Sequence, residues 1–176
     1  MTLRRSRALQ SLMSMYFHLR AVPPPALRNS APWFRRLFED DWDTVRERIG
    51  RHREEVLDKL YGDVELLYCG VPPNHAPEGP RGNVVLGGRP VFHDDPAVPP
   101  FLLLTASQVG RVAGYLRSTD FDGLWRDARP QLLRPYDMPE TEPAVRGMFA
   151  ATHRDLTAFY ERTAQYGDAV VKWLVA

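Results

Sequence analysis

The order of apolar and polar positions predicts a strand near each end of the chain. Residues 15–20 alternate between apolar and polar side chains and are rich in aromatics, and the prolines at 23–25 end this pattern. Residues 169–175 are apolar on both alternations except at Lys172, which is typical of a strand covered on both faces. We therefore expect the C-terminal strand to be central in a sheet, with the N-terminal strand beside it, since a chain end needs to be tied down.

The clearest local signal begins a helix in the middle of the chain. Residues 101–104 form a short apolar run that predicts a strand. Thr105 and Gln108 have the spacing of a capping box, in which each side chain bonds the backbone N–H of the other residue. The apolar positions from Val109 to Leu116 then recur at helical spacing. The sequence thus predicts a strand that runs directly into a capped helix.

Two further helices are predicted in the second half of the chain. Asp120 is placed to cap a short helix, and the proline-rich residues 129–143 predict a loop after it. From Val145 to Tyr160 an apolar stripe at helical spacing predicts a long helix, and Gly167 is placed to end it.

The first half of the chain gives weaker patterns. We expect a helix over residues 42–60, which follows the capping pair Asp40-Asp41, and a short strand over residues 64–69. Residues 70–82 are dense in proline and glycine, and a mobile loop is expected there.

A glycine pair predicts a hairpin near the middle of the chain. Gly87 and Gly88 separate two apolar runs, so we expect a hairpin over residues 83–92, with Pro90 confining the second strand to an edge or a bulge. A phosphate-binding glycine loop is the alternative. Because no helical pattern follows Gly88, the hairpin is favoured.

Length and composition favour one α+β domain. The chain has 176 residues, of which 44% are hydrophobic and 26% charged, as in an ordinary globular domain. Strands at both ends with helices between them predict a small mixed sheet packed by several helices over residues 13–176. Residues 1–12 are basic and lack acids, and we expect a disordered extension or a misplaced start there rather than a targeting signal.

Charge and cysteine usage narrow the expected partners and the expected cellular compartment. The net charge is +1, and without Arg4, Arg5 and Arg7 the remainder is slightly acidic, so no nucleic-acid partner is expected. Cys69 is the single cysteine, which excludes an internal disulfide and favours a reducing, cytoplasmic compartment. No apolar run approaches the roughly 20 residues of a membrane span, so no membrane association is expected.

His93-Asp94-Asp95 is the most tempting chemical cluster. An imidazole and two carboxylates are able to bind a divalent metal or transfer protons. Adjacent residues on a turn point in different directions, however, and Asp94-Asp95-Pro96 is ordinary turn sequence. A pair of His18 with His93 is a further option if the N-terminal strand lies beside the hairpin. We predict no metal site.

Other single residues have structural and functional interpretations. Lys172 must pair with a carboxylate, line a cavity or guard a strand edge, because it is alone in an apolar strand. Cys69 is expected to be a small core residue, and His153 a surface or boundary histidine of the long helix. The chain contains no Cys-x-x-Cys, His-Glu-x-x-His, Gly-x-Ser-x-Gly or Walker sequence, so no cofactor is predicted.

Several of these segments, in this order, resemble the YfbM-like family, a bacterial group of unknown function. The resemblance covers about residues 13–176, and it implies a mixed α+β domain without an assigned active site. It is carried by Met15-Tyr-Phe-His-Leu-Arg20, Val84-Val-Leu-Gly-Gly88, Phe101-Leu-Leu-Leu-Thr-x-x-Gln-Val109, Phe159-Tyr160 and Gly167-Asp-Ala-Val-Val-Lys-Trp-Leu174.

The chain departs from the family pattern in two places. Leu133–Pro139 stands where the family has a Tyr-Pro-x-x-Trp-like segment, and the family's tryptophan-containing segment is degraded around Glu55–Tyr68. If those segments line a family pocket, the resemblance implies that the pocket is altered here.

Two classes of function remain open. The favoured one is a non-catalytic binding or protein-interaction module, such as an accessory or immunity-like protein with a protein partner. It rests on the missing catalytic motifs and on a surplus of large aromatics that one small core cannot hold at its centre, namely Trp33, Phe34, Trp42, Trp125, Tyr136 and Trp173. The alternative is a small hydrolase or transferase acting on a polar ligand such as a nucleotide, with a pocket formed by His18, Arg89, His93 and Asp94. The sequence gives no indication of the oligomeric state.

Overall fold

The computed structural model describes residues 15–70, 78–136 and 138–175. In this part of the chain, five strands form one open sheet in the order β2-β1-β5-β4-β3, and seven α-helices pack on its two faces. The expected α+β class and single domain are confirmed. The sheet was expected to be mixed but is antiparallel throughout, because β5 runs opposite to both β1 and β4. The expectation for residues 1–12 lies outside the described residues, as does most of that for residues 70–82.

β5 (Ala169–Val175) is the central strand of the sheet. It pairs over its whole length with β1 (Tyr16–Val22) and, more briefly, with β4 (Phe101–Leu104) on the other side. Val170 belongs to the hydrophobic cluster of one face and Trp173 to that of the other. The central position of the C-terminal strand and its pairing with the N-terminal strand are therefore both confirmed.

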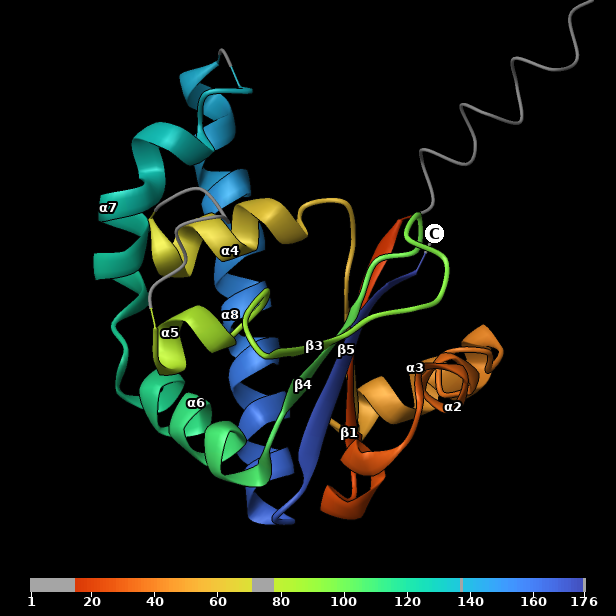
Figure 1. Ribbon diagram of the computed structural model, residues 1–176. Helices are drawn as coiled ribbons and strands as arrows, with labels where there is room; N and C mark the ends of the chain where they lie inside the picture. Colours follow the sequence, from red (N-terminus) through yellow and green to blue (C-terminus); the bar gives the residue numbers. More distant parts are fainter. Residues whose placement is uncertain (1–14, 71–77, 137, 176) are drawn as a thin grey trace, which may run out of the picture.

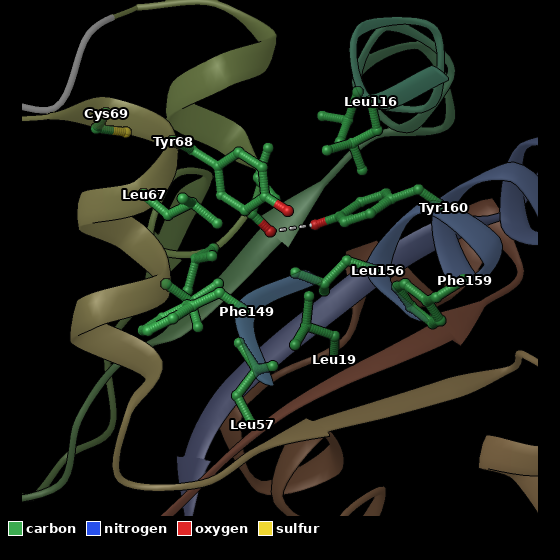
Figure 2. Packing of buried hydrophobic residues seen from close by; sticks show 14 of the residues in the cluster. Leu19, Leu57, Leu67, Tyr68, Cys69, Leu116, Phe149, Leu156, Phe159 and Tyr160 are labelled. Atoms are coloured by element: carbon green, nitrogen blue, oxygen red, sulfur yellow. Dashed lines mark hydrogen bonds between the residues drawn. The ribbon is translucent and has the colours of Figure 1, made fainter. Parts of the chain in front are cut away.

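Five helices cover one face of the sheet (Figure 1). They are α4 (Tyr61–Cys69), α5 (Pro80–Asn83), α6 (Ala106–Ser118), α7 (Phe121–Leu132) and α8 (Glu142–Gln165); the short 3-10 helix η3 (Pro139–Thr141) precedes α8. Leu19 of β1 shares a buried cluster with Leu156 and Phe159 of α8 (Figure 2). Full burial of one such side chain contributes about 1.5–3 kcal/mol, so α8 is strongly held to the sheet.

A smaller layer covers the opposite face (Figure 1). It contains η1 (Pro24–Arg28), α2 (Ala31–Arg36) and α3 (Trp42–Gly50). Phe101 packs against Trp173 with ring centroids 4.9 Å apart and against Phe34 at 5.6 Å. The indole N–H of Trp173 donates to the carbonyl oxygen of Pro99 at 3.0 Å, so this buried ring keeps its hydrogen bond.

The capping box at the start of α6 is confirmed. The backbone N–H of Gln108 donates to Oγ1 of Thr105 at 3.2 Å, and that of Thr105 donates to Oε1 of Gln108 at 2.9 Å. Asp120 likewise caps α7, as expected. This helix continues through Pro130 to Leu132, so the loop that was expected from residue 129 begins later.

The helix expected over residues 42–60 is wrong in its second half. α3 ends at Gly50, and the chain turns at His52, which has a φ of 56°. Residues Glu54–Leu57 then form β2, paired with β1 at the edge of the sheet. Glycine has a low helix propensity, and here it coincides with the true end of the helix.

The strand expected over residues 64–69 is wrong, because this segment is the second half of α4. Val64, Leu67 and Tyr68 are all buried and have the i, i+3, i+4 spacing of a helix face. A short apolar run does not distinguish a buried helix from a buried strand. Gly70, with a φ of 65°, provides the left-handed residue that ends the helix.

The hairpin expected over residues 83–92 is also wrong in its first strand. Residues 80–83 are α5, and β3 (Arg89–Val91) pairs with β4 instead. Gly88 has a φ of 126°, and a Cβ there would lie 2.9 Å from the carbonyl oxygen of Leu103. The glycine therefore permits a close approach to β4 rather than a two-residue turn. The edge position expected for Pro90 is confirmed.

Candidate functional site

His18 and Glu54 form a buried acid–imidazole pair beside the smaller helical layer. β1 places His18 opposite Val56 of β2, and Glu54 precedes Val56 by two residues on the same face. Nδ1 of His18 lies 3.0 Å from Oε1 of Glu54, which is only 1% exposed. A carboxylate at Nδ1 orients the ring and leaves Nε2 as the nitrogen able to act on a ligand.

Arg48 of α3 holds the other carboxylate oxygen of Glu54. Its Nε donates to Oε2 of Glu54 at 2.7 Å, and its Nη2 lies 2.9 Å from Oδ2 of Asp40. Arg20 approaches the same Asp40 oxygen at 3.4 Å and also donates to the carbonyl oxygen of Leu37. Burial, together with the charge of Arg48, lowers the pKa of Arg20. Two arginines and two carboxylates thus balance in charge and tie β1, β2 and α3 together.

Three aromatic side chains surround a hollow in front of this network, which we call the inner hollow. Its volume is about 250 Å³, and it is lined by Tyr16, His18, Phe38, Asp40, Trp42, Val45 and Val175. The rings of Tyr16 and Trp42 meet at 75° with centroids 5.2 Å apart. The imidazole plane of His18 is inclined by 79° to the ring of Phe38, and the two ring centroids lie 5.8 Å apart. The inner hollow therefore has aromatic walls with different orientations and one carboxylate.

A larger hollow, the outer groove, shares Tyr16 and Trp42 with the inner hollow. Its volume is about 490 Å³, within the range of roughly 300–1,000 Å³ that is typical of ligand pockets. Trp42 is 46% exposed and Met148 of α8 is 38% exposed. The lining is mostly apolar and comes from β1, α3, β2, α4 and α8, chiefly Tyr16, Trp42, Leu57, Val64, Met148 and Phe149.

The outer edge of β2 lies at this groove. Ala21 donates its N–H to the carbonyl oxygen of Arg53, and the alternation of an antiparallel ladder then turns the N–H of Val56 away from β1. That N–H donates instead to Oε1 of Glu55 at 3.0 Å. Burial raises the pKa of Glu55 to about 7, and the nearby Asp155 contributes. The free edge of β2 is thus capped by its own side chain.

The opposite face of the sheet contains a second polar cluster, around residues 83–86. Lys172 is fully buried, and its Nζ donates to the carbonyl oxygens of Asn83 at 2.8 Å and Val85 at 2.7 Å. The hydroxyl of Tyr160 donates to the carbonyl oxygen of Val84 at 2.6 Å (Figure 2). Side chains from β5 and α8 therefore hold three consecutive carbonyl groups.

Glu65 of α4 completes this cluster. Its Oε2 accepts the backbone N–H of Leu86 at 3.0 Å, and its Oε1 accepts from Sγ of Cys69 at 3.2 Å. Complete burial lowers the pKa of Lys172 to about 7, against the charge of Glu65. Burial also raises the pKa of the Cys69 thiol to about 12, which makes it a poor nucleophile. The expected core role of Cys69 is confirmed.

The candidate residues singled out from the sequence do not gather in one pocket. His18 lies in β1 and Arg89 in β3, with β5 and β4 between them, which is about 14 Å at the usual strand spacing. His93 accepts the backbone N–H of Asp95 at 3.1 Å in the connection after β3, and Asp94 is exposed. Lys172 faces the other layer. Because β5 is central, Lys172 does not guard a strand edge.

Three features of the structure were not predicted from the sequence. Glu54 was placed inside a helix, which hid its position opposite the N-terminal strand. The surplus of aromatics did signal the exposure of Trp42, but not the groove beside it. His153 was expected at the surface or boundary, yet it is nearly buried, and its Nδ1 lies 2.9 Å from the hydroxyl of Tyr68.

Two kinds of feature are absent from the described part of the chain. Across residues 15–70, 78–136 and 138–175, no group of three or more histidine, cysteine or acidic side chains is arranged to hold a metal ion. Within the same ranges, no helix is both long and apolar enough to cross a membrane.

The fold recurs in YfbM from Escherichia coli, whose crystal structure is that of a protein of unknown function. The two structures match with a TM-score of 0.61 at 15% sequence identity, over 91% of this chain and 99% of that chain. At this identity the likeness shows the fold alone. None of the curated proteins matches the chain in sequence.

The resemblance to YfbM-like proteins is confirmed at the level of the family. The family described as "Domain of unknown function (DUF1877)" matches residues 13–173, which is most of the chain. The chain therefore belongs to the family Domain of unknown function (DUF1877).

Proposed function

We propose that the chain is a non-catalytic binding module whose partner is a protein that inserts apolar side chains into the outer groove. One observation carries the proposal: Trp42 and Met148 both stand half-exposed in the lining of a groove of about 490 Å³, most of whose lining residues are apolar. Large aromatics and methionine are enriched where proteins bind one another. Tryptophan buries much area at low entropic cost, and the flexible methionine side chain adapts to its partner.

The surroundings of the groove favour insertion of side chains over addition of a strand. A partner strand would need the outward N–H of Val56, which is already bonded to Glu55. The groove walls, in contrast, present apolar side chains from two helical layers, so that pockets between them are open to a protruding side chain. The rim contains one charge of each sign, Arg46 and Asp58, which gives no preference for a charged partner.

A matched pair of methionines tests this proposal. A photo-crosslinking amino acid at position 148, on the groove wall, should give an adduct with one defined protein in cells that make this chain. The same label at position 138, outside the groove, should not give that adduct. The captured protein, once purified, should bind Met148→Glu at least tenfold more weakly than wild type. It should bind Met138→Glu, an exposed methionine elsewhere, as tightly as wild type. Equal binding by both variants contradicts the proposal.

An enzyme remains the second candidate, and the His18–Glu54 pair is the observation that favours it. A buried carboxylate that orients an imidazole is the arrangement of a general base. The candidate is a hydrolase or transferase that uses His18 on a polar ligand in the inner hollow, without Arg89, His93 or Asp94. Turnover of chromogenic phosphate or carboxylate esters that is lost in His18→Asn supports it, and turnover that survives this change contradicts it.

A further inference from the structure

The inner hollow has features that the proposed protein contact does not use. Tyr16, Phe38 and Trp42 supply three aromatic rings around a volume of about 250 Å³, which is slightly below the usual range for a drug-sized ligand. The ring of His18 lies near two of these rings, with its centroid 5.8 Å from that of Phe38 and 6.0 Å from that of Trp42. The space therefore suits one small, compact group rather than an extended molecule.

Asp40 gives the lining of the inner hollow one carboxylate. Asp40 is the acidic side chain of its lining in the described part of the chain, beside the phenol of Tyr16 and the imidazole of His18. Arg20 and Arg48 touch Asp40 but do not line the hollow. These two arginines hold the carboxylate in place and partly neutralise it, and they do not occupy the space between the aromatic rings. In the described residues, no arginine stacks on Phe38 or Trp42, so the ring faces are not already occupied by a cation.

We infer that the inner hollow binds an organic cation of the quaternary ammonium class. The faces of aromatic rings carry partial negative charge and attract a cation within about 6 Å of their centroids, most strongly when it is desolvated. A primary ammonium group would need three hydrogen-bond acceptors, whereas Asp40, the carboxylate of the lining, is already paired with Arg20 and Arg48. A trimethylammonium group needs none and buries its methyl groups against the rings. The cation is either a free choline-like molecule or the trimethylated lysine of a peptide.

This inference is independent of the proposed protein contact, because the linings of the two sites share only Trp42 and Tyr16. Met148 lines the outer groove but not the inner hollow, whereas Phe38 and Asp40 line the inner hollow but not the outer groove. Substitutions at these residues therefore separate a failure of one proposal from a failure of the other.

Calorimetric titration of the whole chain tests the inference. Choline should bind at least tenfold more tightly than 3,3-dimethylbutan-1-ol, its neutral isostere with carbon in place of nitrogen. Trp42→Leu should weaken choline binding at least tenfold and Asp40→Asn about threefold, while Trp33→Leu and Met148→Glu leave it unchanged. A trimethyllysine peptide that binds more tightly than choline, and more tightly than its unmethylated form, identifies a peptide source. Preference for choline identifies a free ligand.

Two outcomes overturn the inference. Equal binding of choline and its neutral isostere means that the hollow is merely apolar. Absence of binding by choline and by the methylated peptide at millimolar concentration means that it is ordinary packing space. If Trp42→Leu does not fold, the indole proton resonances of Trp42 in the wild-type chain decide: they shift during the titration if the cation lies against the ring and stay unchanged if it does not.

Discussion

The Nζ of Lys172 lies 2.7 Å from the carbonyl oxygen of Val85, so the one lysine of the central strand is bound to backbone from a segment far away in the sequence. A second bond to Asn83 at 2.8 Å makes this side chain a clamp between β5 and the residues after α5. Lys172→Met keeps the volume of the side chain but removes its hydrogen-bond donors. We predict that it lowers the free energy of unfolding by about 3 kcal/mol, because the two buried carbonyl groups lose their donor and the buried Glu65 loses a nearby positive charge. Urea unfolding measures this.

The other lysine provides the control for this experiment. Lys59 is exposed, and Lys59→Met should change stability by no more than about 0.5 kcal/mol. The pH dependence adds a check. Because burial lowers the pKa of Lys172 to about 7, the folded state binds fewer protons than the unfolded state between about 7 and the usual value of 10.5. The stability of the wild type should therefore rise with pH across that window, and the stability of Lys172→Met should not. An unchanged stability and pH profile would show that Lys172 is not a clamp.

The sequence predicted the centre of the sheet well, because the patterns that mark it are local. Val171 and Trp173 face one layer and Val170 the other, and this apolar pattern on both alternations is visible without knowing any partner. Thr105 and Gln108 carry their signal within one helical turn. Such features depend on spacing alone, which a sequence contains in full.

The segment from α3 to β3 could not be predicted in the same way. The helix over residues 42–60 was extended past Gly50 because Val56 and Leu60 continue the apolar spacing, although Val56 belongs to a strand. The candidate site fails for a related reason. His18 was recognised, but Glu54 is 36 residues away and meets it only through the register of β1 and β2. A contact of this kind depends on tertiary pairing rather than on the pattern of either segment.

Loss of the buried carboxylate at Glu54 should be costly. Glu54→Ala leaves Arg48 and His18 without their shared acceptor, and removal of one partner from a buried ion pair typically costs about 3–5 kcal/mol. The exposed pair of Glu47 in α3 with Arg51, the residue just after this helix, is the control, and Glu47→Ala should cost less than about 1 kcal/mol. Thermal and urea unfolding compare the two. Similar small losses for both would mean that the network around Glu54 contributes little to stability.

The capping box of α6 should be measurable as a local contribution. Thr105→Ala removes the acceptor for the N–H of Gln108 and should lower the free energy of unfolding by about 1 kcal/mol. Thr105→Ser retains the hydroxyl and should recover most of the loss. If Thr105→Ala and Gln108→Ala are both neutral in urea unfolding, the box does not stabilise the helix.

Glu55 on the edge strand β2 should make stability depend on pH in the opposite sense to that expected from Lys172. Burial, with the carboxylates of Asp155 and Glu54 nearby, raises the pKa of Glu55 to about 7, whereas the unfolded chain has the ordinary value of 4.5. Between these values the folded state binds more protons than the unfolded state, so stability should fall as pH rises from 4.5 towards 7 and level off above it.

Glu55→Gln separates this effect from every other titrating group. Glutamine stays neutral, and its Oε1 is still able to accept the N–H of Val56, so the cap of the edge strand is retained. The variant should match the wild type at pH 4, where Glu55 is protonated in both states, and exceed it at pH 8, where the wild type must bury a charge. Urea unfolding at both pH values measures the difference. A variant that is less stable than the wild type at pH 8 would show that the ionised carboxylate is well accommodated and that Glu55 does not carry a raised pKa.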